Sequence, residues 1–419
     1  MDLQTWLERL LQLHPKDIEL GLDRVRPVAE TLGVLRPARR VVTVAGTNGK
    51  GSTVAMLESA AVAAGWKVGA YTSPHLQRYN ERVRVQGVEA SDAELVEAFE
   101  AVDAARGEVP LTYFEFGTLA ALWLFRRTRL DLVVLEVGMG GRLDAVNLVD
   151  ADIAILTTVD LDHQHWLGPD REAIGREKAG IFRPGRPALI GEREPPASVL
   201  EFAAGLGARL ERRGFHFDLR DRGARLRYHD VQGELEMPRP LLAAPAQLDN
   251  AAVAVRALRL LRMPAAAIAR GVASAAPAGR LQRLPGVPEV VLDVAHNPQA
   301  TAQLAAWLDI QGGSTRAVFA ALADKDVQGI ASELEGRIAG WHLAGLDGPR
   351  GQSCEALAER VRAALPDAVP SLHADVPSAL EAALSAAAET GQRVLVFGSF
   401  QTVGAALAVL GRIGRVLGP

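Results

Sequence analysis

Residues 41–53 read VVTVA-GTNGKGST: a short β-branched run, a glycine-rich turn and the small polar residues with which a helix begins. A phosphate group needs this order, because glycines let backbone N–H groups approach its oxygens and the helix N-terminus adds positive potential. Lys50 would reach the β- and γ-phosphates, and Ser52 or Thr53 would lie close to a metal ion. The loop departs from the common Walker A pattern, since Gly51 follows the lysine and Val44 occupies the first glycine position. A plain connecting turn is the alternative, but strand, helix and lysine together favour a phosphate site.

Further apolar runs alternate with helix-like stretches in the first part of the chain. Residues 67–72, 132–137 and 153–157 are continuous and apolar, which is typical of strands in a parallel sheet covered on both faces. We therefore expect an α/β fold that starts with a P-loop-type three-layer domain, with its sites at the carboxyl ends of the strands. Between about residues 205 and 240 arginines mix with short alternating stretches, which predicts a small antiparallel excursion.

A second α/β domain is expected after a linker. Residues 275–280 combine small residues with a proline and are the best linker candidate. The βα alternation then restarts with strand-like runs such as 290–293 and 393–397. We predict a first domain over residues 1–274 and a smaller, Rossmann-like domain over residues 281–419.

The composition excludes several classes of protein. The formal net charge of −4 argues against a nucleic-acid binder, which usually carries a basic surplus. Cys354 is the only cysteine, so an internal disulfide and cysteine-based metal sites are excluded, which fits a reducing cytoplasm. Residues 1–11 form an amphipathic pattern rather than a secretory signal, and no apolar run is long enough to span a bilayer. We expect a cytoplasmic protein that binds neither nucleic acid nor membranes.

The glycine loop is also the first of several motifs that resemble one family. It is similar to the loop of the Mur-ligase superfamily, and the glycine after its lysine resembles the folylpolyglutamate synthase branch. Further motifs of the family follow in its order over essentially the whole chain: Thr72-Ser-Pro-His-Leu76, Glu81-Arg-Val-Arg-Val85, Glu136-Val-Gly-Met-Gly-Gly-Arg-Leu-Asp144, Leu161-Asp-His163, Glu177-Lys-Ala-Gly-Ile-Phe182, Asp293-Val-Ala-His-Asn-Pro298 and Gly398-Ser-Phe400. The resemblance implies a monomeric ligase that uses ATP and Mg²⁺ to add L-glutamate to dihydropteroate and to the γ-carboxylate of reduced folates.

The same resemblance implies two magnesium sites. By it, Glu136 and Ser73 ligate one ion, and His163 helps to bind a second. Glu136 ends a continuous apolar strand, where a carboxylate is costly unless it meets a cation; the alternative is an ion pair with Arg142. His165 stands where the family usually has an acidic residue.

Lys178 has two interpretations. Its stretch, residues 176–181, is amphipathic, and by itself this favours a solvated surface lysine. In the family the matching lysine reacts with carbon dioxide, which turns a cation into a carboxylate able to approach the metal site. The resemblance therefore implies N6-carboxylysine at Lys178, with a role in catalysis beside Lys50, Glu136 and His163.

ATP contacts are implied on both domains. The phosphates would lie against Thr47, Asn48, Gly49, Lys50, Gly51 and Ser52. Asn250 matches an adenine-contacting asparagine, Arg280 a nucleotide-binding arginine, and Asp293 a nucleotide-binding aspartate suited to ribose hydroxyls. From its surroundings alone, Arg280 is a solvated linker charge.

The folate side is predicted from three segments. Residues 112–115 resemble the family's pteroate-binding stretch, where an aromatic edge and a carboxylate suit a pterin ring. Residues 143–145 match another pteroate contact, and residues 18–25 resemble a folate-side loop. The predicted pteroate contacts are Thr112, Tyr113, Phe114, Glu115, Leu143, Asp144 and Ala145. Arg82 and Arg84 alternate with valines on an expected strand, so both should face the same way; they meet an anionic glutamate tail or line a solvated face.

The implied reaction runs through an acyl phosphate. The γ-phosphoryl of ATP passes to the substrate carboxylate, and the amine of L-glutamate then displaces phosphate. Three alternatives stay open: another amino-acid ligase of the superfamily, folylpolyglutamate synthase activity alone, or a non-catalytic nucleotide-dependent switch. The presence of Lys50, Glu136 and His163 together argues against the switch, because a binder alone would not require the metal set.

Overall fold

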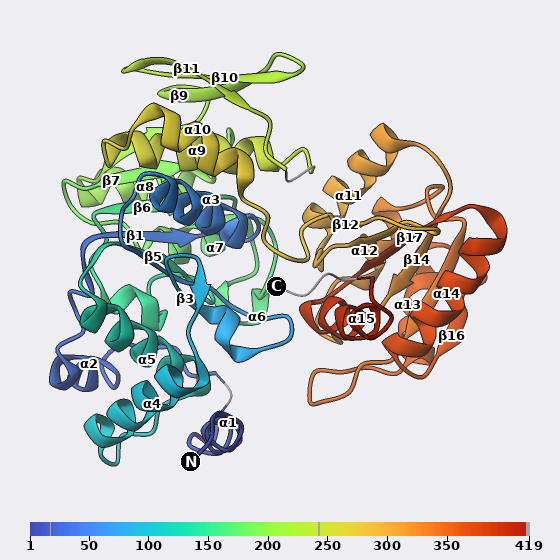
Figure 1. Cartoon of the computed structure of the whole chain (residues 1–419), viewed down its shortest axis with the longest axis horizontal. Coiled ribbons are helices and arrows are strands. Elements are labelled where there is room, and N and C mark those ends of the chain that lie inside the picture. Colours follow the sequence, from blue (N-terminus) through green and yellow to red (C-terminus); the bar gives the residue numbers. More distant parts are fainter. Residues whose placement is uncertain (17, 242–243, 416–419) are drawn as a thin grey trace. The chain divides into compact units, whose positions relative to one another are not determined.

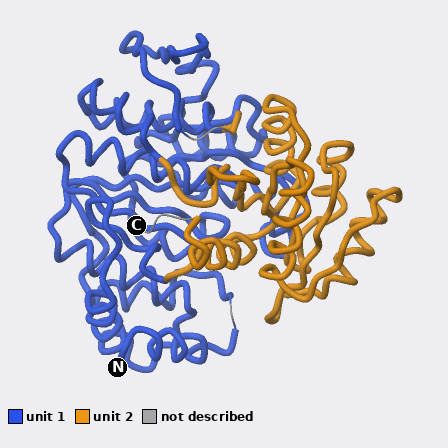
Figure 2. Tube along the Cα trace, turned by 45° about the vertical axis from the view of Figure 1, so that its right-hand side comes forward, with its two compact units in different colours: residues 1–75, 79–241, 247–275 blue, residues 76–78, 242–246, 276–419 orange. Residues whose placement is uncertain are grey.

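The computed structural model describes residues 1–16, 18–241 and 244–415, which fall into two compact units (Figures 1 and 2). As far as they are described, the first unit comprises residues 1–75, 79–241 and 247–275, and the second comprises residues 76–78, 242–246 and 276–419. Each unit is built around a sheet of its own.

The sheet of the first unit has eight strands in the order β4-β3-β2-β5-β1-β6-β7-β8. Their bounds are β1 Ala38–Ala45, β2 Val68–Tyr71, β3 Val83–Val85, β4 Val88–Glu89, β5 Leu130–Glu136, β6 Ile153–Leu156, β7 Pro187–Ile190 and β8 Arg209–Arg212. Along the sheet, β2, β5, β1, β6, β7 and β8 pair in parallel, whereas β3 runs antiparallel to both of its neighbours, β2 and β4. Val44 lies between Glu136 and Ile155 in register, so the carboxyl ends of β1, β5 and β6 meet where the glycine loop begins.

Helices cover both faces of this sheet, as the continuous apolar strands predict (Figure 1). They are α1 Leu3–Leu10, α2 Arg26–Leu32, α3 Lys50–Ala63, α4 Asp92–Arg106, α5 Tyr113–Thr128, α6 Gln164–Leu167, α7 Arg171–Ala179, α8 Ala197–Leu206, α9 Gln247–Leu260 and α10 Ala265–Ser274, with 3-10 turns η1 Tyr79–Arg82 and η2 Ala145–Leu148. One core joins Val41, Ala45 and Val133 to α1, α2, α4, α5, α7 and α8. Because strand side chains alternate, the fully buried Val42 and Val44 face the other side, where α3 packs with α9 and α10.

The predicted antiparallel excursion is present but begins later than expected. It is a three-stranded sheet of β9 Phe217–Asp221, β10 Arg225–Asp230 and β11 Gly233–Pro238. The preceding β8 instead pairs in parallel with β7 and closes the main sheet; its charged residues are tolerated because it is an edge strand. Arg256 of α9 bonds Glu211 of β8 and Asp230 of β10, and this buried ion network holds the small sheet against the unit.

The second unit is a six-stranded sheet in the order β12-β13-β17-β14-β15-β16. Its elements are β12 Gln282–Leu284, β13 Val290–Leu292, α11 Pro298–Gln311, β14 Thr315–Phe319, α12 Val327–Glu333, β15 Gly340–Ala344, α13 Cys354–Ala364, β16 Ser371–His373, α14 Val376–Thr390, β17 Arg393–Phe397 and α15 Phe400–Arg412. Only β12 is antiparallel. One face packs on α11, α12 and α13 and the other on α14 and α15, which is the expected Rossmann-like arrangement.

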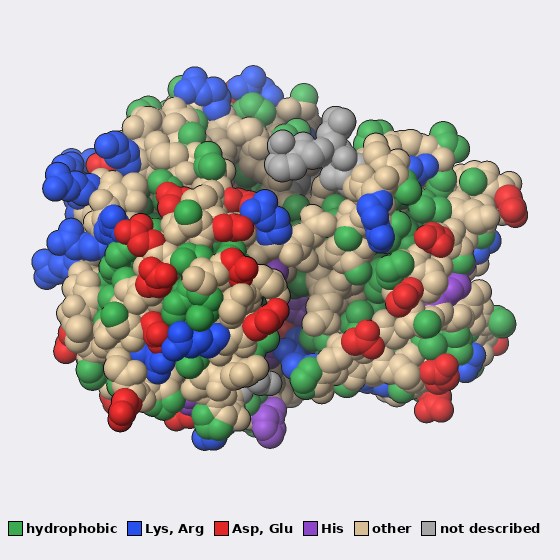
Figure 3. Space-filling model, turned by 60° about the horizontal axis from the view of Figure 1, so that its bottom comes forward, with side chains coloured by type: hydrophobic (Ala, Val, Ile, Leu, Met, Phe, Trp, Pro, Cys, Tyr) green, Lys and Arg blue, Asp and Glu red, His purple; other side chains and the backbone are tan. Residues whose placement is uncertain are grey.

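On the face drawn in Figure 3, acidic and basic side chains are interspersed with apolar ones. Over the described residues, no helix is both long and apolar enough to cross a membrane.

Candidate active site

The glycine loop joins β1 to α3 and is closely packed. Gly46 and Gly49 have φ values of 150° and 86°, conformations that suit glycine. A Cβ at Gly46 would overlap Thr157, and one at Gly49 would overlap the side chain of Asn250. Lys50 begins α3 and folds back, donating from Nζ to the carbonyl oxygens of Gly46 at 3.0 Å and Thr47 at 3.1 Å. The backbone is therefore drawn tightly around the helix N-terminus, as a phosphate site requires.

Asn250 lies in the first turn of α9 and is linked to the same loop. Its Nδ2 donates to Gln247 Oε1 at 2.9 Å, and Gln247 Nε2 donates to Ser52 Oγ at 3.2 Å. Sequence reasoning missed Gln247, because nothing local distinguishes one polar residue at the start of a helix. The chain of amides fixes α9 against the helix that carries Lys50.

The predicted metal residues lie at the carboxyl edge of the sheet. Glu136 ends β5 and is 4 % exposed, and the backbone N–H of Ser73 lies 3.4 Å from its Oε2. His163 precedes α6 in a left-handed conformation, with φ 52°. The alternative partner of Glu136 is excluded, because Arg142 instead pairs with Glu177 at 2.9 Å.

Lys178 is buried, so the surface interpretation is wrong. Its exposed fraction is 4 %. Burial, reinforced by Lys50 and opposed by Asp162 and Asp144, lowers its pKa to about 7. Helix α7 ends against the loop after β5, because a Cβ at Gly141 would meet the Lys178 backbone. An amine of this kind is partly neutral near neutral pH and is therefore nucleophilic.

The three predicted folate-side segments come together in the first unit. Gly21 donates its N–H to Leu143 O at 3.3 Å, and Arg24 donates to both oxygens of Glu115, at 2.9 Å each. Thr112 and Glu115 also cap α5 reciprocally. The carboxylate of Glu115 therefore anchors the loop of residues 18–25 to the start of α5, a pairing across 91 positions that the sequence did not reveal.

Other side chains of these segments have distinct environments. The ring of Phe114 lies where a Cβ of Gly138 would be, so it covers the loop that follows Glu136. Asp144 is 3 % exposed and accepts from the N–H groups of Met139 and Val146. Burial raises its pKa to about 6, against the lowering effect of these bonds and of Lys50.

Arg82 and Arg84 have different partners. Arg82 ends a 3-10 turn, is 8 % exposed and lies over the rings of Tyr79 and Tyr113. Its Nε donates to His75 Nδ1 at 2.8 Å, and burial together with Arg82 lowers the His75 pKa to about 4. Among the described residues, no carboxylate forms an ion pair with Arg82. Arg84, in β3, pairs with the buried Glu58 at 2.8 Å, so neither arginine lines a solvated face.

The second unit carries Arg280 and Asp293. The guanidinium of Arg280 lies 5.1 Å from the ring centroid of Phe400. Asp293 follows β13 and accepts from the N–H groups of Leu281 at 2.7 Å and Ala295 at 2.8 Å. Burial raises the Asp293 pKa, with Arg280 as the main opposing influence. These contacts orient the turn that follows the strand.

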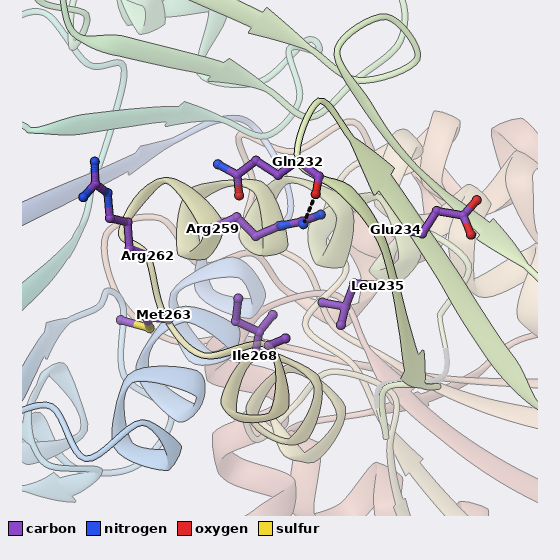
Figure 4. Close-up of a pocket in the computed structure, with 8 residues that line it drawn as sticks. Gln232, Glu234, Leu235, Arg259, Arg262, Met263 and Ile268 are labelled. Atoms are coloured by element: carbon purple, nitrogen blue, oxygen red, sulfur yellow. Dashed lines mark hydrogen bonds between the residues drawn. The ribbon is translucent and has the colours of Figure 1, made fainter.

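A cavity of about 260 Å³ lies elsewhere in the first unit, between the turn of β10 and β11 and helices α9 and α10 (Figure 4). Arg259 crosses it and donates to Gln232 O at 3.1 Å, and Leu235 and Ile268 supply apolar lining. Within the described part of the chain, none of the predicted site residues lines this cavity.

Comparison with known proteins agrees with the fold and site. Residues 44–191 match the Mur ligase middle domain, and residues 279–400 match the Mur ligase glutamate ligase domain. The chain is therefore a Mur-type ligase. It is 47 % identical over 413 residues to the dihydrofolate synthase/folylpolyglutamate synthase of Escherichia coli, covering 97 % of this chain and 95 % of that protein. The Haemophilus influenzae counterpart is 39 % identical, with 97 % of each chain covered.

Solved structures lead to the same family. Escherichia coli FolC in complex with DHPP and ADP superimposes with a TM-score of 0.93 at 46 % identity, covering 99 % of each chain. The Yersinia pestis bifunctional enzyme complexed with AMPPNP and Mn ion gives 0.90 at 45 % identity, covering 98 % of each chain. The chain belongs to the dihydrofolate synthase/folylpolyglutamate synthase family, and the family predicted from the sequence motifs is confirmed.

Proposed function

We propose that this protein is an ATP- and Mg²⁺-dependent ligase that adds L-glutamate to dihydropteroate, giving dihydrofolate, and to the γ-carboxylate of reduced folates, giving polyglutamates. The observation that carries the proposal is the shared edge of one sheet: the glycine loop follows β1, Glu136 ends the neighbouring β5, and Leu143 of the loop after β5 bonds the N-terminal segment at Gly21. Phosphate, metal and pteridine elements thus belong to one unit.

We assign nucleotide binding to the residues that match the family's nucleotide motifs. The N–H groups and side chains of Thr47 to Ser52 surround the phosphates, with Asn250 at the adenine and Arg280 and Asp293 as further nucleotide contacts. The close packing of Gly46 and Gly49 supports the phosphate assignment, because a Cβ at either position would overlap a neighbouring side chain and prevent this conformation of the loop. Lys50 neutralises charge on the transferring group, which is most of what phosphoryl transfer asks of a protein.

The residues present fit magnesium. Glu136 supplies a buried carboxylate and Ser73 a hydroxyl, both of them hard oxygen donors of the kind that Mg²⁺ prefers. We assign these two residues to one site and His163 to a second. When bound, magnesium supplies positive charge that neutralises the oxygens of the transferring phosphoryl group.

We further propose that Lys178 is N6-carboxylysine. The support is its burial and its pKa of about 7, since a neutral amine can add to carbon dioxide and the resulting anion would lie near Lys50. An intact mass spectrum recorded under bicarbonate tests this. A labile carbon dioxide adduct that is lost on acidification and absent from Lys178→Arg is expected; no adduct at any bicarbonate concentration contradicts the modification.

Chemistry at the substrate needs orientation and charge neutralisation. The substrate carboxylate attacks the γ-phosphorus of ATP and ADP leaves; the glutamate amine then attacks the acyl carbon, loses a proton and displaces phosphate. Tyr113 and Phe114 offer aromatic surface to the pteridine, together with Thr112, Leu143, Asp144 and Ala145. Glu115 holds this surface in place through Arg24.

We assign the anionic end of the substrate to Arg82. A buried cation without a carboxylate partner is costly, and the neutral state of His75 leaves the positive charge of Arg82 available. We also propose that the protein is monomeric, as the family resemblance implies, and cytoplasmic, for which the single cysteine is the support.

Phosphate release from ATP tests the function. The assay contains Mg²⁺ and L-glutamate, with either dihydropteroate or tetrahydrofolate, and Lys50→Ala serves as the inactive control. Release with both pteridines is expected. Release with tetrahydrofolate alone would restrict the protein to folylpolyglutamate synthesis, and release with neither, from a folded protein that binds ATP, would point to another amino-acid ligase of the superfamily.

A further inference from the structure

The loop after β6, residues 157–160, is bonded to the phosphate loop along its length. Thr47 donates its backbone N–H to Thr158 O at 2.8 Å, and Asn48 donates its own to Thr158 Oγ1 at 3.1 Å. The hydroxyl of Thr47 bonds Asp160 O at 3.1 Å and accepts the Asp160 N–H at 3.0 Å. Any displacement of this loop therefore moves the backbone of the phosphate loop.

An ion pair holds the other side of the same loop. Glu192, just after β7, accepts the Val159 N–H on Oε1 at 3.1 Å, and Arg171, the first residue of α7, donates from Nε to Val159 O at 2.9 Å. Arg171 Nη2 lies 3.3 Å from Glu192 Oε2. The N–H and the C=O of Val159 are thus both hydrogen-bonded to the same ion pair. The Val159 side chain is fully buried, so core packing holds the side chain of this residue while the ion pair holds its backbone.

The pair is suited to rigid positioning. The side chain of Glu192 is 13 % exposed, and charge-assisted hydrogen bonds are roughly twice as strong as neutral ones. Burial raises the pKa of Glu192 to about 7, opposed chiefly by Arg171 and reinforced by Asp160. The arginine also donates to Glu194 O at 3.2 Å, which ties the start of α7 to the segment that follows β7.

We propose that Glu192 and Arg171 are positioning residues for nucleotide binding, which act by clamping Val159 and, through Thr158 and Asp160, the backbone of Thr47 and Asn48. This inference rests on the proposed function, because it assumes that the phosphate loop binds ATP. The two residues do not need to touch the nucleotide; they set the orientation of the groups that do.

The test is ADP binding by Glu192→Gln, measured by titration calorimetry in Mg²⁺ buffer at pH 8, above the Glu192 pKa of about 7. The amide keeps the shape of the side chain but loses the charge that Arg171 needs, so we expect the ADP dissociation constant to rise roughly five- to twentyfold. The dissociation constant for dihydropteroate should stay within about twofold, and the KM for ATP should rise more than kcat falls.

Asp152→Asn is a matched control. Asp152 also accepts a backbone N–H, that of Val41 at 3.0 Å, and pairs with an arginine, Arg186, at 3.0 Å, but Val41 lies in the middle of β1, five residues before the phosphate loop begins at Gly46. We expect this variant to bind ADP like the wild type. Arg171→Gln removes the other partner of the ion pair and replaces Glu192→Gln in the test if that variant folds poorly.

Two results would overturn the proposal. One is an ADP dissociation constant within about twofold of the wild type in a clamp variant that folds. The other is equal weakening of ADP and dihydropteroate binding together with a lower melting temperature, which would make the pair merely structural. Failure of the wild type itself to bind ADP would instead refute the proposed function, so the two failures are distinguishable.

Discussion

Replacing Arg24 by methionine would leave a buried carboxylate without its cation. Glu115 is 5 % exposed in its side chain and receives a bond on each oxygen from Arg24, at 2.9 Å. Breaking a buried ion pair by removing one partner costs about 3–5 kcal/mol. Arg24 is 19 % exposed and the N–H of Thr112 still reaches Glu115, so we expect a loss of about 2–3 kcal/mol in the free energy of unfolding.

Urea unfolding followed by circular dichroism measures this loss. Arg186→Met removes a more exposed arginine, 57 % exposed, from its pair with Asp152 in the same unit, and should cost no more than about 0.5 kcal/mol. Adding Glu115→Gln to Arg24→Met should restore part of the stability, because no uncompensated charge remains. The KM for dihydropteroate should also rise more than that for ATP.

The pH dependence sharpens the prediction. Burial already raises the pKa of Glu115, and Arg24 counteracts this, so the variant should hold the carboxyl proton to a higher pH. An acid whose folded-state pKa is raised loses stability as pH rises above its unfolded value, and Arg24→Met should therefore lose more stability than the wild type as the pH rises above 4.5. Equal unfolding midpoints for Arg24→Met and Arg186→Met, or no recovery in the double variant, would refute the reasoning.

Three further predictions concern other parts of the chain. Lys50→Ala and Glu136→Ala should each lower phosphate release by roughly 10²–10³ with unchanged melting; near-normal turnover in both contradicts the site. Gly49→Ala should abolish ADP binding in calorimetry and cost at least about 1–2 kcal/mol in urea, because its φ of 86° and the Asn250 side chain leave no room for a Cβ; normal ADP affinity counts against this packing. Burial beside His373 lowers the pKa of His342 from 6.5 to about 4, so as the pH falls the unfolded chain takes up this proton before the folded protein does. The free energy of unfolding should therefore fall by up to about 2–3 kcal/mol as the pH drops from about 6.5 to 4. An equally steep fall in His342→Gln would exclude this histidine as the cause.

Local pattern was enough to predict the architecture. Continuous apolar runs such as residues 132–137 identify strands buried on both faces, and they form the parallel sheets found in both units. The excursion was placed too early, because an edge strand with exposed charges, β8, has the same pattern as a strand of a small antiparallel sheet. Pairing partners, unlike strands, are set by tertiary packing.

The site was only partly predictable for the same reason. A loop such as residues 46–52 carries its chemistry in consecutive residues, so it can be identified from the sequence. The environment of Lys178 cannot be identified in this way. Its stretch of sequence is amphipathic, and Lys178 is buried only because α7 packs against the loop at Gly141. Likewise, the partner of Glu115 is Arg24, which lies far away in the sequence. Arg82 belongs to a 3-10 turn that precedes the strand, so the alternation with valines wrongly placed it in the strand.

Mass analysis of the pteridine product tests the central claim most directly. Wild-type protein is incubated with ATP, Mg²⁺ and labelled L-glutamate, with dihydropteroate in one reaction and tetrahydrofolate in another. The proposed ligase yields dihydrofolate carrying one labelled glutamate in the first reaction and tetrahydrofolate carrying added labelled glutamates in the second, both abolished by Lys50→Ala. Unchanged pteridines in both reactions, from protein that is folded and binds ADP, would contradict it.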